Sequence, residues 1–331
     1  MDTLTHIAFG ATLGGLMLRR QAGWKAFAYG AALANLPDID AVMHGETVGY
    51  LLIHRGITHS LFFQALAVPI IVALILALHR DQRPHWLRWS LFAWLAMATH
   101  SLMDAMNPYG AQLLAPFSDQ AISFNLLYVV DPIFTIPLLL GLWAAWRWRP
   151  KRAQTMLAAG LLVSMTYLTF AATAKWHVQG VVEAELARQN KPVDAVLVMP
   201  MPFTTLLWRA LAVDEQAYYE GYYSLVDGSA EVSFSRNDNQ PDLLEPLMDH
   251  LPVQQLKRFA QGFYHVEVAG EKIVIRDLRL GQGSYYPVSF VVGQVQADMI
   301  EPVPDRRFHE PLPSGELSWL WQRIWREQPP A

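Results

Sequence analysis

Long apolar runs in the first half of this 331-residue chain constrain its fold more than any other feature. Leu61–Leu78 is an almost unbroken run of about 18 residues and Thr155–Ala174 one of about 20, each near the length that crosses the hydrocarbon core of a bilayer. Trp86–Met103 and Val129–Trp146 are predicted to be spans as well, since membrane helices tolerate the prolines of the second. The chain is therefore predicted to be an integral membrane protein.

Two shorter apolar segments precede these runs, at roughly Thr3–Arg20 and Gly23–Leu36. At about 1.5 Å per residue the second covers only about 20 Å, so we expect it to be tilted, partly inserted or packed inside a helical bundle. An alternative is a hairpin of both segments that lies in the membrane interface. Small residues allow helices to approach closely, and they occur at Gly10, Gly14, Gly15, Gly30, Ala31 and Ala34.

Basic residues are distributed unevenly among the loops. The loops between Pro37 and Ser60 and between Asp104 and Tyr128 contain a single basic residue, Arg55. Because Lys and Arg concentrate on the cytoplasmic side, six crossings place the N-terminus, these two loops and the C-terminal part outside. The prediction is a multi-pass protein of the bacterial inner membrane with a periplasmic or extracytoplasmic C-terminal domain. The other loops carry Arg19, Arg20, Lys25, Arg80, Arg83, Arg88, Arg147, Arg149, Lys151 and Arg152.

Histidine and aspartate gather at the predicted outer ends of the helices. Ionisable groups at membrane depth are costly and usually mark function. The outer position of these residues agrees with the predicted topology, and this agreement is independent evidence because the topology depends on Lys and Arg alone. His79 and His85 fall in an inner basic loop and are interpreted as solvated. The outer set is Asp2, His6, Asp38, Asp40, His54, His59, His100, Asp104 and, as a weaker candidate, Asp131.

The spacing within this set suits metal binding. Asp2 and His6, like His100 and Asp104, are four residues apart, which places both members of a pair on one helical face. Imidazole and carboxylate ligands without any cysteine favour zinc, with manganese or iron as alternatives. We expect one to three divalent ions, which activate water and clamp a phosphoryl group. Each element also has a structural interpretation, such as a helix-surface hydrogen bond, a helix stop or a cap.

The chain carries four motifs: Asp2-x-x-Thr5-His6, Pro37-Asp38-x-Asp40, His54-Arg55-x-x-Thr58-His59-Ser60 and His100-x-x-x-Asp104-x-x-Asn107-x-x-Gly110. Taken together, these motifs resemble those of the YdjM-type (DUF457) family, whose members are described as inner-membrane, metal-dependent hydrolases. The resemblance covers about residues 1–175 and implies a distant similarity to zinc-dependent phospholipase C and P1-type nucleases. That similarity implies His6, Asp38, His59, His100 and Asp104 as ligands. A second His-x-x-x-Glu helix is not evident, which leaves Asp2, Asp40 and His54 as candidates to complete the set.

The composition changes after Trp176, where charged residues become evenly spread. We therefore predict a transmembrane helical domain over residues 1–176, a bundle of about six hydrophobic helices, and an extramembrane α+β domain over 177–331 that caps the site or selects substrate. Four tyrosines, Tyr218, Tyr219, Tyr222 and Tyr223, are predicted to lie in its core rather than at lipid headgroups. Strands are predicted at Val193–Met199, Ala217–Leu225, Glu231–Ser235, Tyr264–Val268 and Lys272–Leu280, the last two joined by a three-residue turn, and short helices at Leu243–Leu251 and Val253–Phe259.

The leading hypothesis is a membrane-bound metal-dependent hydrolase of a phosphoester, including a lipid-linked one that reaches the site from the bilayer. Asp38 or Asp40 would hold metal and orient water, and Arg55 would steady negative charge on the substrate or, alternatively, pair with Asp38 or Glu46. Membrane lipids are the expected partners. Nucleic acid is not expected, because a net charge of −4 provides no basic surface for its phosphates.

The rival hypothesis is a non-catalytic metal-binding scaffold or a transporter. Almost purely apolar midplane stretches count against transport. An intramembrane protease is not supported, because the sequence contains no His-Glu-x-x-His motif.

Overall fold

The computed structural model describes residues 1–42, 45–148, 150–228, 231–283, 285–296, 299–309 and 315–326. The chain divides into two compact units. The first is Met1–Val42, Ile53–Ala172 and Pro202–Thr204, and the second is Met43–Leu52, Thr173–Met201 and Thr205–Ala331. The domain boundary predicted at Trp176 lies inside one helix, α7 (Pro150–Arg188), which continues from the first unit into the second.

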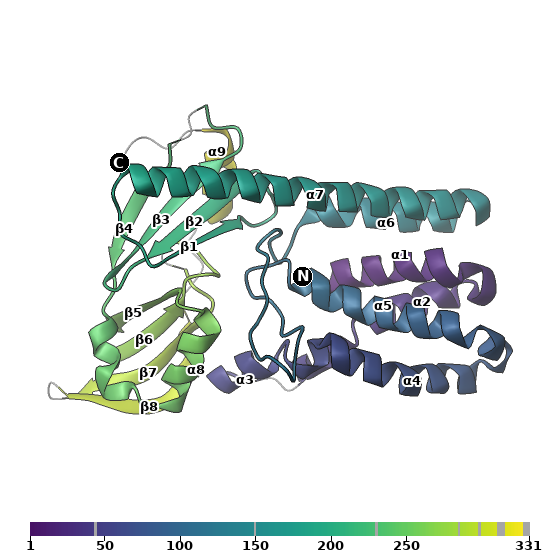
Figure 1. Ribbon diagram of the computed structural model, residues 1–331, viewed down its shortest axis with the longest axis horizontal. Coiled ribbons are helices and arrows are strands. Elements are labelled where there is room, and N and C mark those ends of the chain that lie inside the picture. Colours follow the sequence, from purple (N-terminus) through teal and green to yellow (C-terminus); the bar gives the residue numbers. More distant parts are fainter. Residues whose placement is uncertain are drawn as a thin grey trace. The chain divides into compact units, whose positions relative to one another are not determined.

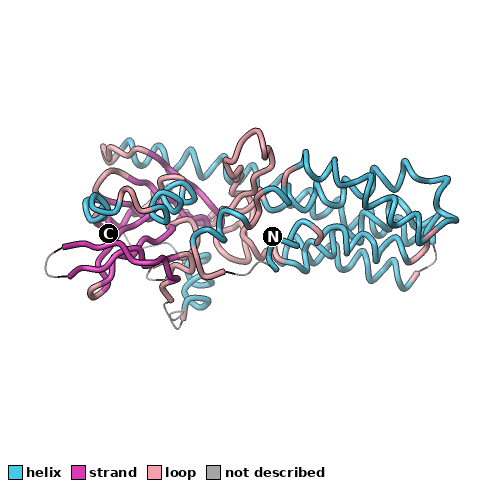
Figure 2. Tube along the Cα trace, turned by 90° about the horizontal axis from the view of Figure 1, so that it is seen from below, coloured by secondary structure: helices cyan, strands magenta, loops and turns pink. Residues whose placement is uncertain are grey.

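The first unit is helical, and every apolar segment singled out in the sequence forms a helix there. Its turns between α1 and α2, α4 and α5, and α6 and α7 gather at one end of the helices (Figure 1), so the basic loops lie together. Figure 2 shows the same helices running alongside one another. They are α1 (Thr3–Ala22), α2 (Lys25–Ala34), α4 (Leu61–Leu78), α5 (Trp86–Asp104), α6 (Pro132–Arg147) and the first part of α7, with short 3-10 helices η1 (Pro37–Val42), η2 (Ile57–His59) and η3 (Arg80–His85).

Two of the described helices, α4 and the Arg152–Arg188 part of α7, are long and apolar enough to cross a membrane, rather than the six predicted. α6 is apolar but shorter, and α2 has only 10 residues, or about 15 Å. α1 and α5 are long enough, but polar residues such as His6 and Asp104 lower their average apolarity.

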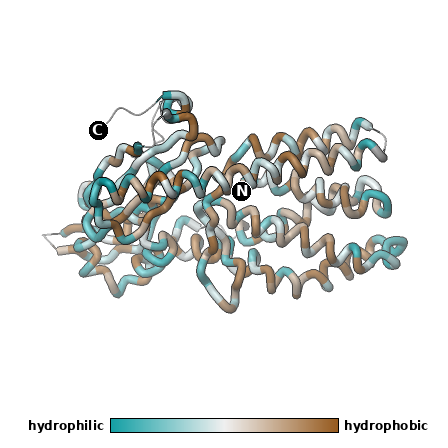
Figure 3. Tube along the Cα trace, turned by 45° about the horizontal axis from the view of Figure 1, so that its top comes forward, coloured by the Kyte–Doolittle hydropathy of each residue, from teal (hydrophilic) through white to brown (hydrophobic). Residues whose placement is uncertain are grey.

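The surface of α4 is unlike that of a helix in water. Leu66, Ile70, Leu74 and Leu78 are all more than half exposed, and Figure 3 shows hydrophobic residues along the helices of this unit. A surface helix of a soluble protein would present polar residues there. The exposed apolar face therefore fits contact with lipid.

Close packing of α1 on α2 depends on glycine. A Cβ atom at Gly10 would lie 2.2 Å from the carbonyl oxygen of Gly30 and 2.4 Å from the Cβ of Ala34. No side chain fits at that distance, so the two backbones touch directly, as the small residues predicted. This contact holds α2, and the chain that follows it into η1, against the N-terminal end of α1.

The second unit contains two four-stranded antiparallel sheets. Their orders are β1-β2-β3-β4 and β5-β6-β7-β8, so each sheet is a meander of sequential strands. The C-terminal part of α7 packs Val178, Val182 and Leu186 against the first sheet, around Trp208. The strands are β1 (Ala195–Pro200), β2 (Leu207–Val213), β3 (Ala217–Ser224), β4 (Phe234–Asp238), β5 (Tyr264–Ala269), β6 (Lys272–Asp277), β7 (Ser289–Gln296) and β8 (Met299–Arg307), and the helices are α3 (Val48–Ile53), which begins in this unit, η4 (Pro241–Leu247), α8 (Leu251–Ala260) and α9 (Glu316–Trp325).

This unit confirms the α+β prediction in outline. All four tyrosines of β3 are buried, as predicted. The turn between β5 and β6 has two residues instead of three, because Ala269 pairs with Lys272. The sequence prediction missed β2, β7 and β8. β2 is buried along its whole length, so it has no alternation of polar and apolar residues to reveal it.

Candidate metal centre

Four side chains converge at the end of the helices opposite the basic turns. Asp38 comes from η1, His59 from η2, and His100 and Asp104 from the last turn of α5, where their spacing places them on one face. Each offers a ligand atom within 4.8 Å of the others. Three of the four side chains are almost fully buried, whereas Asp38 is 28% exposed and forms the side open to solvent.

The distances among these atoms suit a single cation. Nε2 of His59 lies 3.1 Å from Nε2 of His100, 3.5 Å from Oδ1 of Asp38 and 3.3 Å from Oδ2 of Asp104. Nε2 of His100 lies 3.4 Å from Asp38 and 3.7 Å from Asp104. Four ligands about 2.1 Å from an ion in a tetrahedron are about 3.4 Å apart. The nitrogen and oxygen atoms therefore fit zinc or a cation of similar size.

Hydrogen bonds on the far side of each imidazole orient it toward this position. Nδ1 of His100 donates to the carbonyl oxygen of Ala34 at 2.5 Å, which leaves Nε2 with its lone pair facing the cluster. Nδ1 of His59 lies 3.0 Å from Oγ1 of Thr58, which in turn donates to Oδ2 of Asp40 at 2.6 Å. Such partners fix the tautomer and ring orientation of metal-binding histidines. Metal ligation requires both Nε2 atoms to be unprotonated. In that state two nitrogen atoms 3.1 Å apart cannot satisfy each other, but a cation satisfies both.

The charges around the centre favour a cation as well. Burial raises the pKa of Asp38, but hydrogen bonds from His100 and His59 outweigh burial and hold that pKa well below its usual range. Burial lowers the pKa of His59, yet hydrogen bonds to Asp104 and Asp38 raise it above its ordinary value. The carboxylates thus stabilise positive charge on the His59 ring, and they would stabilise the positive charge of a metal ion at the same place.

A second, more exposed group shares Asp38 with the first. Asp38, Asp40 and His54 also offer three ligand atoms within 4.8 Å of one another. Asp40 is held firmly, because it accepts hydrogen bonds from the backbone N–H of Arg55 at 3.0 Å and from Thr58, and lies 3.0 Å from Nδ1 of His54. Burial raises the pKa of Asp40, but the hydrogen bonds from His54 and Thr58 lower it below its ordinary value.

His6 lies beside the four-residue group without belonging to it. Its ring stacks on that of His100 with centroids 3.8 Å apart, and its Nε2 is 3.3 Å from Oδ1 of Asp104. His6 is fully buried, and neither ring nitrogen has a hydrogen-bond partner among the described residues. The N-terminal amine of Met1 contacts the same oxygen of Asp104. Oδ1 of Asp104 therefore faces His6 and the N-terminal amine, whereas Oδ2 faces His59 and His100.

Arg55 is engaged on its own side of the centre. Its backbone has a φ of 62°, a conformation uncommon for residues other than glycine. Nε lies 3.0 Å from Oδ2 of Asp104, Nη1 donates to Asn107 at 3.1 Å, and the guanidinium lies over the ring of Tyr109. The ion pair expected with Asp38 or Glu46 forms with Asp104 instead, because the turn aims the side chain toward the end of α5.

Two aspartates of the predicted set cap helices and lie outside both groups. Asp2 is the N-cap of α1 and accepts hydrogen bonds from N and Oγ1 of Thr5. Asp131 is the N-cap of α6 and also accepts a hydrogen bond from the hydroxyl of Tyr167 at 2.9 Å. Sequence reasoning did not foresee the roles of Thr58 and the Ala34 carbonyl. Thr58 stands inside the His54–Ser60 motif, whereas nothing in the sequence marks a backbone carbonyl.

The helical unit and its buried histidine and aspartate cluster define a class: a helical module with a candidate metal centre, followed by an α+β domain. The family model described as YdjM inner membrane protein matches residues 1–178. The chain therefore belongs to the YdjM inner membrane protein family.

Two relatives extend this comparison. The chain is 26% identical to YfhP of Bacillus subtilis (strain 168) over 321 residues, covering 88% of this chain and 90% of that protein. It is 37% identical to the inner membrane protein YbcI of Escherichia coli (strain K12) over 95 residues, which is 28% of this chain and 53% of that protein. No solved structure matches the chain significantly, so the similarity to zinc-dependent phospholipase C and P1-type nucleases stays a prediction.

Proposed function

We propose that this protein is a membrane-bound, metal-dependent hydrolase of phosphoesters whose centre holds two divalent cations that share Asp38. The observation that carries the proposal is the pair of Nε2 atoms of His59 and His100, 3.1 Å apart. Each is oriented by a partner on its other ring nitrogen, and two carboxylates flank them. Zinc suits this set of nitrogen and oxygen ligands, with manganese or iron as alternatives.

The two groups of ligands suit different tasks. The buried group of four completes the coordination of one ion, whereas the group of Asp38, Asp40 and His54 supplies three ligands beside solvent. Three protein ligands with an open position are typical of catalytic metal sites. Paired divalent ions activate water and stabilise charge on a phosphoryl group, which is why a phosphoester is the proposed substrate.

The protein side chains have defined parts in this proposal. Asp38 is the shared ligand, and its partial exposure leaves it beside incoming substrate. Asp40 binds through one oxygen, while Thr58 and the Arg55 amide hold the other. The Arg55 guanidinium offsets the charge of Asp104 and is the candidate to steady negative charge on the substrate.

An apolar groove next to the centre supports a substrate with a hydrocarbon chain. The groove has a volume of about 320 Å³ and runs between α4, α5 and the two short helices. Pro37 and Ile39, on either side of Asp38, line it, as do Thr58, next to His59, and Phe63. A lipid-linked phosphoester would place its phosphate at the metals and its chain in this groove.

The orientation in the membrane belongs to the same proposal. With the basic turns on the cytoplasmic side, the centre and the C-terminal domain face outward. Because the chain has no cysteine, a single introduced cysteine is the only thiol of the protein that a maleimide can label. In intact cells of a Gram-negative host with a permeabilised outer membrane, a membrane-impermeant maleimide should label Gln240→Cys but not Arg80→Cys. The reverse pattern would overturn this orientation.

The function is tested by metal content and hydrolysis together. Purified protein should contain two equivalents of metal and hydrolyse bis(p-nitrophenyl) phosphate or a phospholipid in mixed micelles, and a chelator should abolish the activity. His100→Ala should lose both activity and the buried ion. His54→Ala should lose activity but keep one ion, and His85→Ala, a histidine in a basic turn, should behave like the wild type. Full activity in both His100→Ala and His54→Ala would refute the proposal.

One observation favours a second candidate, a non-catalytic scaffold. Four protein ligands around the buried position form a closed shell, which is characteristic of structural zinc. In that case the protein would hold a single ion, His54→Ala would leave the metal content unchanged, and no phosphoester would be hydrolysed.

A further inference from the structure

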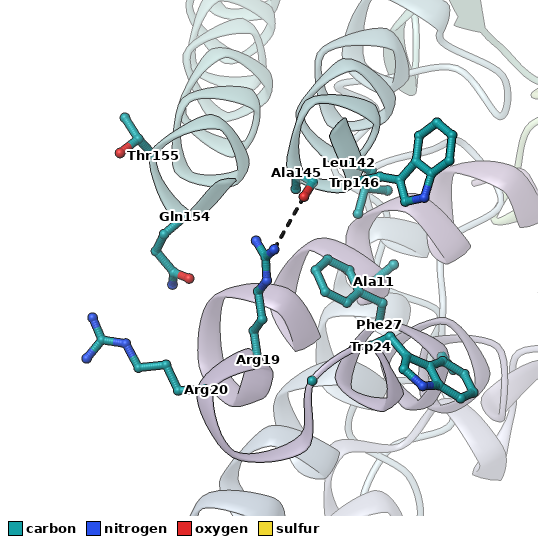
Figure 4. A pocket seen from close by; sticks show the side chains of 12 residues that line it. Ala11, Arg19, Arg20, Trp24, Phe27, Leu142, Ala145, Trp146, Gln154 and Thr155 are labelled. Atoms are coloured by element: carbon teal, nitrogen blue, oxygen red, sulfur yellow. Dashed lines mark hydrogen bonds between the residues drawn. The ribbon is translucent and has the colours of Figure 1, made fainter. Parts of the chain in front are cut away.

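A large cavity opens at the opposite end of the helical unit, among the basic turns. It lies between the α1–α2 hairpin and the α6–α7 hairpin and has a volume of about 1130 Å³ (Figure 4). His6 and Arg19 are separated by 13 residues of α1, or about 20 Å along the helix axis. The cavity is therefore separate from the metal centre, and it is larger than the 300 to 1,000 Å³ typical of small-molecule sites.

The charge inside the cavity is positive, and no residue that the structure describes neutralises it. Arg19 and Arg20 line it, and none of the described lining residues is acidic. Across the three basic turns the sequence has one acidic residue, Asp81. No ion pair joins either arginine to a carboxylate in the described part of the chain. An anion entering the cavity would meet two free positive charges.

The guanidinium of Arg19 is already positioned for an anion. Nη2 donates to the carbonyl oxygen of Ala145 at 3.4 Å, and the group lies 5.8 Å from the ring centre of Phe27. Nη1 is buried, and no described residue accepts a hydrogen bond from it. Since a buried donor without an acceptor is costly, a ligand oxygen at this atom would satisfy an unmet hydrogen bond.

The remaining walls are mostly apolar and open toward the helix surfaces. Leu142, Phe27 and Ala11 contribute to them, and Trp24 and Trp146 stand at the rim, 74% and 82% exposed. Exposed tryptophans in membrane proteins lie at the level of the lipid headgroups. A charged end beside an apolar wall at this depth matches an amphiphile better than a small soluble anion.

We propose that this cavity binds one anionic phospholipid, with its phosphate between Arg19 and Arg20 and its acyl chains along the apolar wall. Basic pockets between membrane helices recognise anionic headgroups in this way. The proposal is independent of hydrolysis at the metal centre, because it uses none of the same residues.

Native mass spectrometry of the full chain in detergent, titrated with phosphatidylglycerol or phosphatidylcholine of the same acyl chains, tests it. One phosphatidylglycerol should bind in preference to phosphatidylcholine. In Arg19→Gln/Arg20→Gln the affinity for phosphatidylglycerol should fall about 30-fold, which corresponds to about 1 kcal/mol for each arginine. Arg80→Gln/Arg83→Gln removes the same charge from another basic turn outside the cavity and should retain the affinity.

A second variant keeps the proposal testable if the protein with Arg19→Gln/Arg20→Gln misfolds. Ala28 is exposed and lines the cavity, so Ala28→Trp should fill the space and abolish binding while both arginines remain. Equal binding of the two lipids, an equal loss in the control pair, or unchanged binding in Ala28→Trp would overturn the proposal. Displacement of the lipid by an equimolar amount of glycerol 3-phosphate would also overturn it, since the ligand would then be a soluble phosphate.

Discussion

Replacing His59 with alanine removes one of the four atoms that converge on the buried cation position. Of the remaining ligands Asp38, His100 and Asp104, only His100 offers a nitrogen atom. The histidine of the second ligand group, His54, lies at Asp40 instead. Loss of an outer partner alone typically costs 10- to 100-fold in metal affinity. We therefore expect loss of the ligand itself to weaken binding at least about 100-fold.

The magnitude follows from linkage between binding and folding. A metal that binds only the folded state at 100 times its Kd stabilises that state by about 2.7 kcal/mol. At the same concentration a variant with a 100-fold weaker Kd gains only about 0.4 kcal/mol. The difference of about 2.3 kcal/mol corresponds to a shift of about 5 to 9 °C in Tm for a unit of about 150 to 250 residues.

Thermal unfolding of the purified protein in detergent, with metal or with chelator, measures this difference. The metal-induced rise in Tm should be about 5 to 9 °C smaller in His59→Ala than in the wild type, and it should remain intact in His85→Ala. Comparing the rise within each variant removes any direct effect of the substitution on stability. The reasoning would be refuted by a rise in His59→Ala equal to that of the wild type.

Three further predictions address the support of the centre, the helix packing and the chemistry of the ligands. Thr58→Val should lower metal affinity about 10- to 100-fold, because it removes the hydroxyl between His59 and Asp40; an unchanged affinity in a competition titration would contradict this role. Gly10→Ala should cost about 1 to 3 kcal/mol by forcing α1 and α2 apart, whereas Gly180→Ala, with open space around it, should be neutral or stabilising in thermal unfolding. Bound metal should be released as the pH falls, since imidazole ligands must be unprotonated; elemental analysis across pH 4 to 8 that shows constant content would contradict imidazole ligation.

The sequence alone determined the two parts of the chain and the end of the helices where the centre lies. Apolar runs are a local property, so they predicted each α-helix that the structure describes within the first unit, although not the short 3-10 helices between them. The distribution of Lys and Arg separated the turns into two sets, and the structure gathers the basic set at one end. His59, His100 and Asp104 lie at the other end, because helices of similar length reverse direction at each turn.

Only the tertiary structure decided which candidates could share a cation. Asp2 and Asp38 are equally plausible ligands by residue type, yet Asp2 caps α1 and Asp38 lies 3.5 Å from His59. The orientation of His100 depends on the carbonyl of Ala34, 66 residues away, which the packing of α2 against α5 brings close. Periodicity reflects neighbours along the chain, whereas metal ligation requires atoms from distant segments within a few ångströms, and such distances are fixed by packing.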